Sequence, residues 1–210
     1  MRSAMGDLLG EDYSLAQKDK PYRCLDLLLK HRDELFHFLK GQWSNLFGAK
    51  YDVLLYDLTS TYFESDPPPG SGSKKRFGYS RDKRSDCVQV VVALVLTPEG
   101  FPVAYEVYPG NTRDTATLEA FLDRIEKQYG KLRRTWLMDC GIPTEETLEK
   151  MRSRGIEYLV GTLKGRLTHV EKPLLEQPWI QARESVRVKT LQQGSEFYVY
   201  VESHDRVAKE

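Results

Sequence analysis

Two acidic residues stand out because each lies within or directly after a run of apolar residues. Asp57 lies inside the segment YDVLLYDLTSTYF at residues 51–63, and Asp139 ends the segment RTWLMD at residues 134–139. A carboxylate in such surroundings loses several kcal/mol of hydration unless a partner or a metal compensates it. If the two segments are adjacent parallel strands, the carboxylates converge and either share a proton or hold a divalent cation. The simpler alternative is that each caps a strand end or pairs with an arginine.

The type of metal follows from the ligands that the sequence offers. Three scattered cysteines and four isolated histidines show no zinc-ligand spacing. Carboxylate oxygens alone suit Mg²⁺ or Mn²⁺. Two such ions can activate a water and stabilise the leaving oxygen of a phosphodiester. In that chemistry Asp57 and Asp139 are metal ligands and not proton-transfer groups.

The elements that must position the two carboxylates are predicted from hydrophobic periodicity and turn residues. Both faces of strand 51–63 are largely apolar, so we expect a central strand that is covered on both sides. The predicted order is helix 21–47, strands 51–63, 86–97 and 101–108, helix 114–129, strand 134–139, helix 143–154 and strand 156–160.

This order predicts an α/β fold. Three antiparallel strands come first, and two right-handed crossovers then add parallel strands. If the fourth strand pairs with the first, the mixed sheet has the order 3-2-1-4-5 with flanking helices, which is the ribonuclease H-like arrangement. Short alternating strands at 186–188 and 197–201 predict a β-strand insert. We therefore expect an N-terminal helical segment at 1–50, a catalytic core at 51–163 and a partial insert at 164–210.

The amino-acid composition says less about function than the two carboxylates do. The chain has 210 residues, with 31 Lys and Arg balanced by 31 Asp and Glu, so a surplus of positive charge does not mark it as a nucleic-acid binder. Its apolar and charged fractions are those of an ordinary globular protein. The start of the chain has no signal peptide, and the longest apolar run, 90–96, is too short to cross a bilayer. We expect a cytoplasmic protein with no membrane partner.

One loop is strongly basic. Cations interleaved with Phe77 and Tyr79 could neutralise phosphates while the rings stack on bases, which predicts a DNA contact. The alternative is a loop that is merely solvated by its charges. The predicted DNA-binding residues are Lys74, Lys75, Arg76, Tyr79, Arg81, Lys83 and Arg84.

Four strings in register carry a family resemblance: YDLTSTYFE at 56–64, FGYSRDKRSD at 77–86, YPGNTRD at 108–114 and WLMDCGIP at 136–143. Together they resemble the DDE transposases of bacterial insertion sequences, in the branch with a β-strand insert. The resemblance implies a ribonuclease H-like domain that uses Mg²⁺, or Mn²⁺, with Asp57 and Asp139 as the first two acidic residues. It also implies nicking and strand transfer on double-stranded DNA, at terminal inverted repeats and target DNA, by a homodimer at the bacterial nucleoid.

The sequence departs from the family at the third acidic residue. The family has Tyr-x-x-Arg-x-x-x-Glu followed by a Lys on a later helix, whereas this chain offers only Arg206 and Glu210, with Ser203 at the Tyr position. We interpret that match as a coincidence and expect the chain to be truncated before the third acidic residue. An alternative function is therefore a catalytically inactive fragment that binds only DNA or a full-length partner.

A second enzyme class shares one short motif. Residues 57–61 (DLTST) match the D-x-T-x-T motif of aspartyl-phosphate phosphatases, in which Asp57 would be the nucleophile. That fold requires a parallel β-α unit directly after the motif. The predicted loop and antiparallel hairpin disfavour this alternative.

Overall fold

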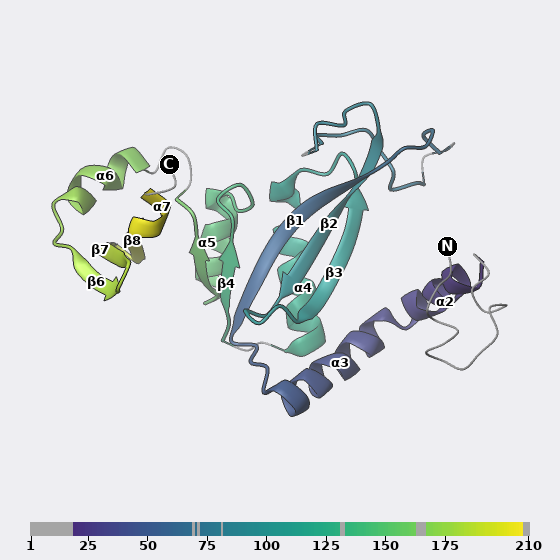
Figure 1. The fold of residues 1–210 in the computed structure, drawn as a ribbon, viewed down its shortest axis with the longest axis horizontal. Coiled ribbons are helices and arrows are strands. Elements are labelled where there is room, and N and C mark those ends of the chain that lie inside the picture. The colour runs from purple at the N-terminus through teal and green to yellow at the C-terminus, as the bar shows by residue number, and fades with distance from the viewer. Residues whose placement is uncertain are drawn as a thin grey trace. The chain divides into compact units, whose positions relative to one another are not determined.

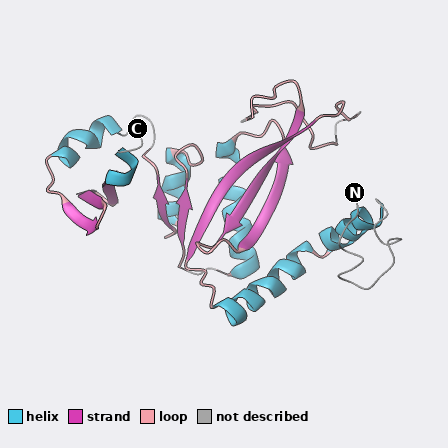
Figure 2. Cartoon of the chain, viewed as in Figure 1, coloured by secondary structure: helices cyan, strands magenta, loops and turns pink. Residues whose placement is uncertain are grey.

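The computed structural model describes residues 19–68, 70, 72–80, 82–130, 133–162 and 167–207 (Figures 1 and 2). The chain divides into two compact units, Met1–Leu159 and Val160–Glu210. Within the described residues, no helix combines the length and the apolar character that a bilayer crossing needs.

The first unit is built on a five-stranded sheet. Its strand order is β3-β2-β1-β4-β5, which confirms the predicted order and the ribonuclease H-like α/β fold. The elements are α2 (Asp19–Lys30), α3 (Arg32–Phe47), β1 (Val53–Phe63), β2 (Val88–Leu96), β3 (Pro102–Pro109), the 3₁₀ helix η2 (Asp114–Ala116), α4 (Leu118–Tyr129), β4 (Thr135–Met138), α5 (Glu145–Ser153) and β5 (Glu157–Val160).

One face of this sheet carries the core. In Figure 1, α4 and α5 both lie behind the sheet. Tyr56 on β1 is buried there, with its ring 5.3 Å from that of Phe121 on α4 and 6.4 Å from that of Trp136 on β4. Its hydroxyl donates to Thr117 Oγ1 at 2.8 Å, and burial raises the pKa of Tyr56 well above its ordinary value. Alternate residues of β1 and β4 therefore point into the core.

The opposite face of β1 differs from the prediction. We expected cover on both sides, but Val53 and Leu55 are half-buried, while Asp57 and Thr59 are exposed. The reason is that α4 and α5 lie on the same side of the sheet, and Tyr56 points to that side (Figure 1). Asp57 consequently keeps its hydration, and the predicted desolvation cost is not incurred.

The N-terminal helical region is interrupted. The sequence predicts one helix at 21–47, whereas the structure has α2 and α3 separated at His31. Gly48 ends α3 in the left-handed conformation, with φ of 64°, and its backbone N–H donates to the carbonyl of Ser44. A glycine adopts this conformation without the strain that a Cβ would bring.

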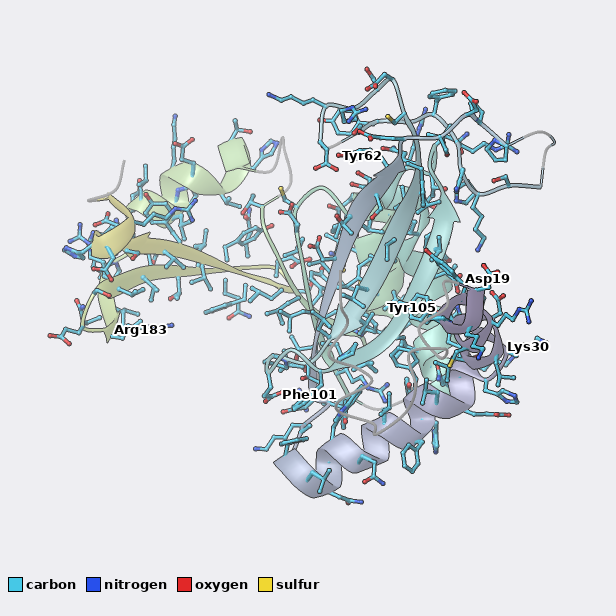
Figure 3. All side chains as sticks on the ribbon, turned by 45° about the vertical axis from the view of Figure 1, so that its right-hand side comes forward. Asp19, Lys30, Tyr62, Phe101, Tyr105 and Arg183 are labelled. Atoms are coloured by element: carbon cyan, nitrogen blue, oxygen red, sulfur yellow. The ribbon has the colours of Figure 1, made fainter. Side chains whose placement is uncertain are left out.

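Helix α3 packs along the edge strand β3. The ring of Phe36 lies 5.7 Å from that of Tyr105, which Figure 3 labels on β3. Arg124 of α4 donates to Asp33 of α3 at 2.7 Å and to Glu106 of β3 at 2.6 Å. This shared arginine links two helices to the edge of the sheet.

The second unit is a three-stranded sheet of order β6-β7-β8 with two helices. The hairpin of β7 and β8 was predicted and turns at Gly194, where φ is 62°. Lys189 of β7 is buried, and its ammonium donates to the carbonyl of Leu175, which holds α6 to the sheet. The elements are α6 (Leu167–Leu175), β6 (Ile180–Arg183), β7 (Val186–Gln193), β8 (Glu196–Ser203) and α7 (His204–Val207).

Candidate metal centre and nucleic-acid interface

Strand register places the two predicted ligand residues at neighbouring backbone positions, at the end of the β1–β4 ladder. β1 and β4 pair in parallel, and the last pair of the ladder is Tyr56 with Met138. Asp57 and Asp139 are the residues that directly follow this pair. Side-chain alternation along β1 puts Asp57 on the face opposite Tyr56, and the same alternation carried one residue past the end of β4 puts Asp139 there too. Two residues that are far apart in the sequence thus occupy neighbouring positions on one face.

Each carboxylate is exposed and only partly engaged. Asp57 Oδ1 accepts the backbone N–H of Leu58 at 2.8 Å, and Asp139 Oδ1 accepts that of Cys140 at 2.7 Å. Neither forms an ion pair with a lysine, arginine or histidine in the described ranges. The arginine pairing that we considered from the sequence is therefore not found there. One oxygen of each group is held by the next amide.

The two carboxylates are suitable ligands for a hard divalent cation, but they supply only part of its coordination sphere. Carboxylate oxygens are the ligands that Mg²⁺ and Mn²⁺ favour, and two of them on adjacent strands can share one ion. Within the part of the chain that the structure describes, no group of three or more His, Cys, Asp or Glu residues could hold a metal. Glu210, which we set aside as a coincidental match, lies outside the described residues.

The phosphatase alternative is not supported by the topology. The D-x-T-x-T motif at 57–61 lies within β1, and the next strand, β2, pairs with β1 in the antiparallel direction. The parallel β-α unit that this alternative requires after the motif is therefore replaced by a loop and a hairpin.

The predicted DNA-binding loop, residues 64–87 and hereafter the basic loop, is fastened to the sheet by one buried amide. Gln89 of β2 is 1 % exposed. Its Nε2 donates to the carbonyl of Tyr79 at 2.8 Å and to that of Gly110 at 2.9 Å, and its backbone pairs with Arg76. Sequence reasoning missed Gln89, although a lone amide in the apolar strand VQVVVALVL was a usable signal.

The residues predicted to contact DNA differ in how free they are. Tyr79 is 88 % exposed, and Lys83 is exposed with φ of 58°. Lys74 Nζ donates to the carbonyl of Val107 at 2.6 Å, so its ammonium lies against β3. Arg81 lies outside the described residues.

The two basic residues that follow Lys74, namely Lys75 and Arg76, also make local contacts. Lys75 Nζ lies 4.1 Å from the ring centroid of Phe63 at the end of β1. Arg76 is half-buried, and its backbone N–H donates to the carbonyl of Gln89 at 3.0 Å. The Lys75 ammonium therefore lies against the end of β1, whereas Arg76 is held by backbone pairing with β2.

Arg84 makes several contacts at the two ends of the basic loop. It contacts both carboxylate oxygens of Asp86 and, at 2.7 Å, Glu64 Oε1. Its guanidinium also lies 4.8 Å from the ring centroid of Tyr62, which Figure 3 labels at the far end of β1. Hydrogen bonds from Arg84 lower the pKa of Asp86 to about 2. Arg84 thus joins the two ends of the loop.

A pH titration should reveal this contact. The Asp86 carboxyl is expected to titrate at about 2 in the wild-type chain and near its ordinary value of 3.8 in Arg84→Gln. Because the folded pKa is depressed, the stabilising effect of this contact is present above pH 3.8 and is lost as the pH falls through about 2. The carboxyl ¹³C chemical shift of Asp86, recorded by NMR as a function of pH, gives the pKa in each of the two proteins. Equal titration midpoints in the two proteins would show that the contact is not formed in solution.

Comparison with known proteins identifies a family through one family model. The family model described as "Transposase DDE domain" matches residues 48–200, which is most of the chain. No curated protein sequence matches. Among solved structures, the chain is similar to a Mos1 transposase paired-end complex with left transposon end, at 15 % identity and a TM-score of 0.36, covering 61 % of this chain and 40 % of that one.

Two further structures are similar at the same level. A piggyBac transposase synaptic complex with hairpin DNA gives 12 % identity and a TM-score of 0.41, covering 73 % of this chain and 33 % of that one. A Mos1 mariner paired-end complex with Mn gives 13 % identity and a TM-score of 0.33, covering 63 % and 42 %. The chain therefore spans less than half the length of these transposases. By its match to the family model over residues 48–200, the chain belongs to the DDE transposases.

Proposed function

We propose that this protein cleaves DNA strands and transfers them at the terminal inverted repeats of a mobile element, with Asp57 and Asp139 as ligands of Mg²⁺ or Mn²⁺. The observation that carries the proposal is the parallel register of β1 and β4, in which Tyr56 pairs with Met138 and the two aspartates follow directly. Acidic oxygens on one face of adjacent strands are the ligand type that a divalent ion needs for phosphodiester chemistry.

The chain's own residues orient this site and leave it accessible. The backbone amides of Leu58 and Cys140 each hold one carboxylate oxygen, which fixes the direction of the other oxygen. The exposed face around Asp57 leaves room for a DNA strand to approach. A bound divalent ion would supply the Lewis acidity that activates water and stabilises the leaving oxygen.

DNA is the proposed partner, bound through the basic loop by Lys74, Lys75, Arg76, Tyr79, Arg81, Lys83 and Arg84. The exposed cation of Lys83 and the exposed ring of Tyr79 lie in this loop, and cations and rings suit phosphates and bases. We further propose that the protein acts as a homodimer at the bacterial nucleoid, and that its chain divides into a helical segment, 1–50, a catalytic core, 51–163, and a β-strand insert, 164–210.

Metal binding tests the carboxylate pair without requiring turnover. Mn²⁺ titrated into the chain should give a saturable heat in calorimetry, and Asp139→Asn should weaken the affinity by at least about tenfold. The basis is that even an outer partner of a metal ligand is worth about 10- to 100-fold in affinity. Asp52→Asn is the matched control, since Asp52 is an exposed carboxylate just before β1 and lies outside the pair.

The outcomes separate the candidate functions. Affinity that is unchanged in Asp139→Asn but reduced in Asp52→Asn would contradict the pair. Saturable Mn²⁺ binding without any nicking of DNA would identify the second candidate, a protein that binds DNA without cleaving it. The observation that favours this candidate is that no group of three or more His, Cys, Asp or Glu residues that could hold a metal is found among the described residues.

A further inference from the structure

A cavity with a mixed polar and apolar lining lies near the carboxyl end of β1. It has a volume of about 380 Å³ and lies among β1, the turn after β4, the loop after β3 and the basic loop. Its walls include Thr59, two positions after Asp57 on the same face, and Gly141, two positions after Asp139. Two residues of extended strand span about 7 Å. The cavity thus lies a short step along β1 from Asp57, with Ser60 and Val91 of its wall on the face that carries Tyr56.

The cavity contains one cation that lacks an anionic partner. Arg113 is exposed and lines it, and it makes no ion pair with a carboxylate of the described residues. Other arginines of this unit are committed, since Arg84, Arg124 and Arg154 each contact two carboxylates. The carboxylate among the lining residues is Asp114, which already has an interaction of its own. Arg113 is therefore the free positive charge of the cavity.

A buried hydroxyl of the wall also lacks a partner. Ser60 Oγ is buried without a hydrogen bond among the described residues, although Ser60 lines the cavity. Buried polar groups in folded proteins nearly always have a partner, so an unpaired one at a cavity wall points to a ligand or a water. Asn111, Thr112 and Thr115 add further neutral donors. A guanidinium with several hydroxyl and amide donors suits the oxygens of a phosphate.

The walls are held in place before any ligand arrives. The Gln89 side chain bonds at once to Tyr79 of the basic loop and to Gly110, the residue before Asn111. Gly78 and Gly110 pack so closely that a Cβ on Gly78 would lie 2.0 Å from the Gly110 carbonyl oxygen. A preformed pocket binds without the entropy loss of ordering its loops.

We propose that this cavity binds a backbone phosphate of the DNA on which the carboxylate pair acts, and that Arg113 is its counter-charge. The proposal rests on the proposed function for the identity of the strand, and on the cavity itself for the chemistry of the ligand. It assigns to the loop after β3 a direct contact with DNA that the basic loop alone would not supply.

The salt dependence of DNA binding tests the contact. The probe is a fluorescent 30-base-pair duplex, with anisotropy recorded in Ca²⁺ at several salt concentrations. Each neutralised phosphate contributes about 0.9 to the slope of log K against log salt. Arg113→Gln should lower that slope by about 0.9 and weaken binding at each salt concentration. Arg133→Gln is the matched control, because Arg133 is exposed and pairs with Glu157.

A second probe separates the two levels of the proposal. Inorganic phosphate, followed by NMR of the arginine side-chain N–H groups, should shift the Arg113 signal and leave that of Arg133 unchanged. If the wild-type chain binds phosphate at Arg113 but binds no DNA, the proposed function fails and the phosphate site stands. If DNA binds with the same slope in Arg113→Gln, or phosphate shifts neither signal, the phosphate site is overturned while the function stands on its own tests.

Discussion

Asp57→Asn is expected to lower the rate of Mn²⁺-dependent nicking of supercoiled plasmid DNA by at least about a hundredfold. A metal ion contributes several kcal/mol of charge stabilisation in the transition state, and each 1.36 kcal/mol is worth about tenfold in rate. Asparagine keeps the size of the side chain and removes the charge that holds the ion. Because Asp57 is exposed, the fold should be unaffected.

The matched control for this experiment is again Asp52→Asn, which removes one exposed carboxylate at the start of the same strand. Its nicking rate should stay within about twofold of wild type, since surface changes away from special features alter stability only slightly. Circular dichroism of both variants shows whether the fold is kept. Equal rates for Asp57→Asn and wild type would contradict the assignment of Asp57 as a metal ligand.

The second large effect is expected from a single added methyl group. A Cβ on Gly110 would lie 2.1 Å from the carbonyl oxygen of Gln89 and 2.4 Å from that of Arg76. Both atoms are backbone, so neither can rotate away. Overpacking of this kind costs about 1–3 kcal/mol, and we expect Gly110→Ala to lower the free energy of unfolding by that amount. The backbone displacement that relieves this clash should also weaken DNA binding, because the contact of Gly110 with Gln89 and Arg76 holds the basic loop to β2.

Urea unfolding followed by tryptophan fluorescence measures the change, with the buried Trp136 as a reporter in the same unit. Gly41→Ala is the control, since a Cβ at Gly41 in α3 meets nothing within 4 Å. Alanine within a helix is favoured over glycine, so this control should leave stability equal or raise it by up to about 1 kcal/mol. A similar unfolding midpoint for Gly110→Ala and wild type would show that the contact of Gly110 with Gln89 and Arg76 is looser than described.

The sequence was sufficient for the order of the strands. The pattern of three strands followed by two crossovers allows few topologies, because parallel connections are right-handed. Once β4 pairs with β1, alternation predicts a shared face for Asp57 and Asp139. These conclusions depend only on local periodicity and on chirality rules.

The features that could not be predicted from the sequence depend on how segments pack against one another in the folded chain. The cover of a sheet face is decided by helix packing, so the exposed side of Asp57 could not be predicted from apolar neighbours. α6 was not predicted because Pro173 inside it favours a break. β6 was missed because its residues are all exposed and show no alternation. The role of Gln89 arises from contacts between two loops that are distant in the sequence.

The parallel ladder of β1 and β4 also limits how the length of β4 can change in evolution, because odd and even changes have different effects. A slip of one position in β4 would turn Asp139 toward Tyr56 and the helices, where an unpaired carboxylate is costly. A slip of two would return it to the open side, merely displaced along the strand. Insertions and deletions in β4 are therefore constrained to even numbers, whereas the loops between the two strands can change length freely. Lineages of this domain should vary in loop length and keep this odd–even relation intact.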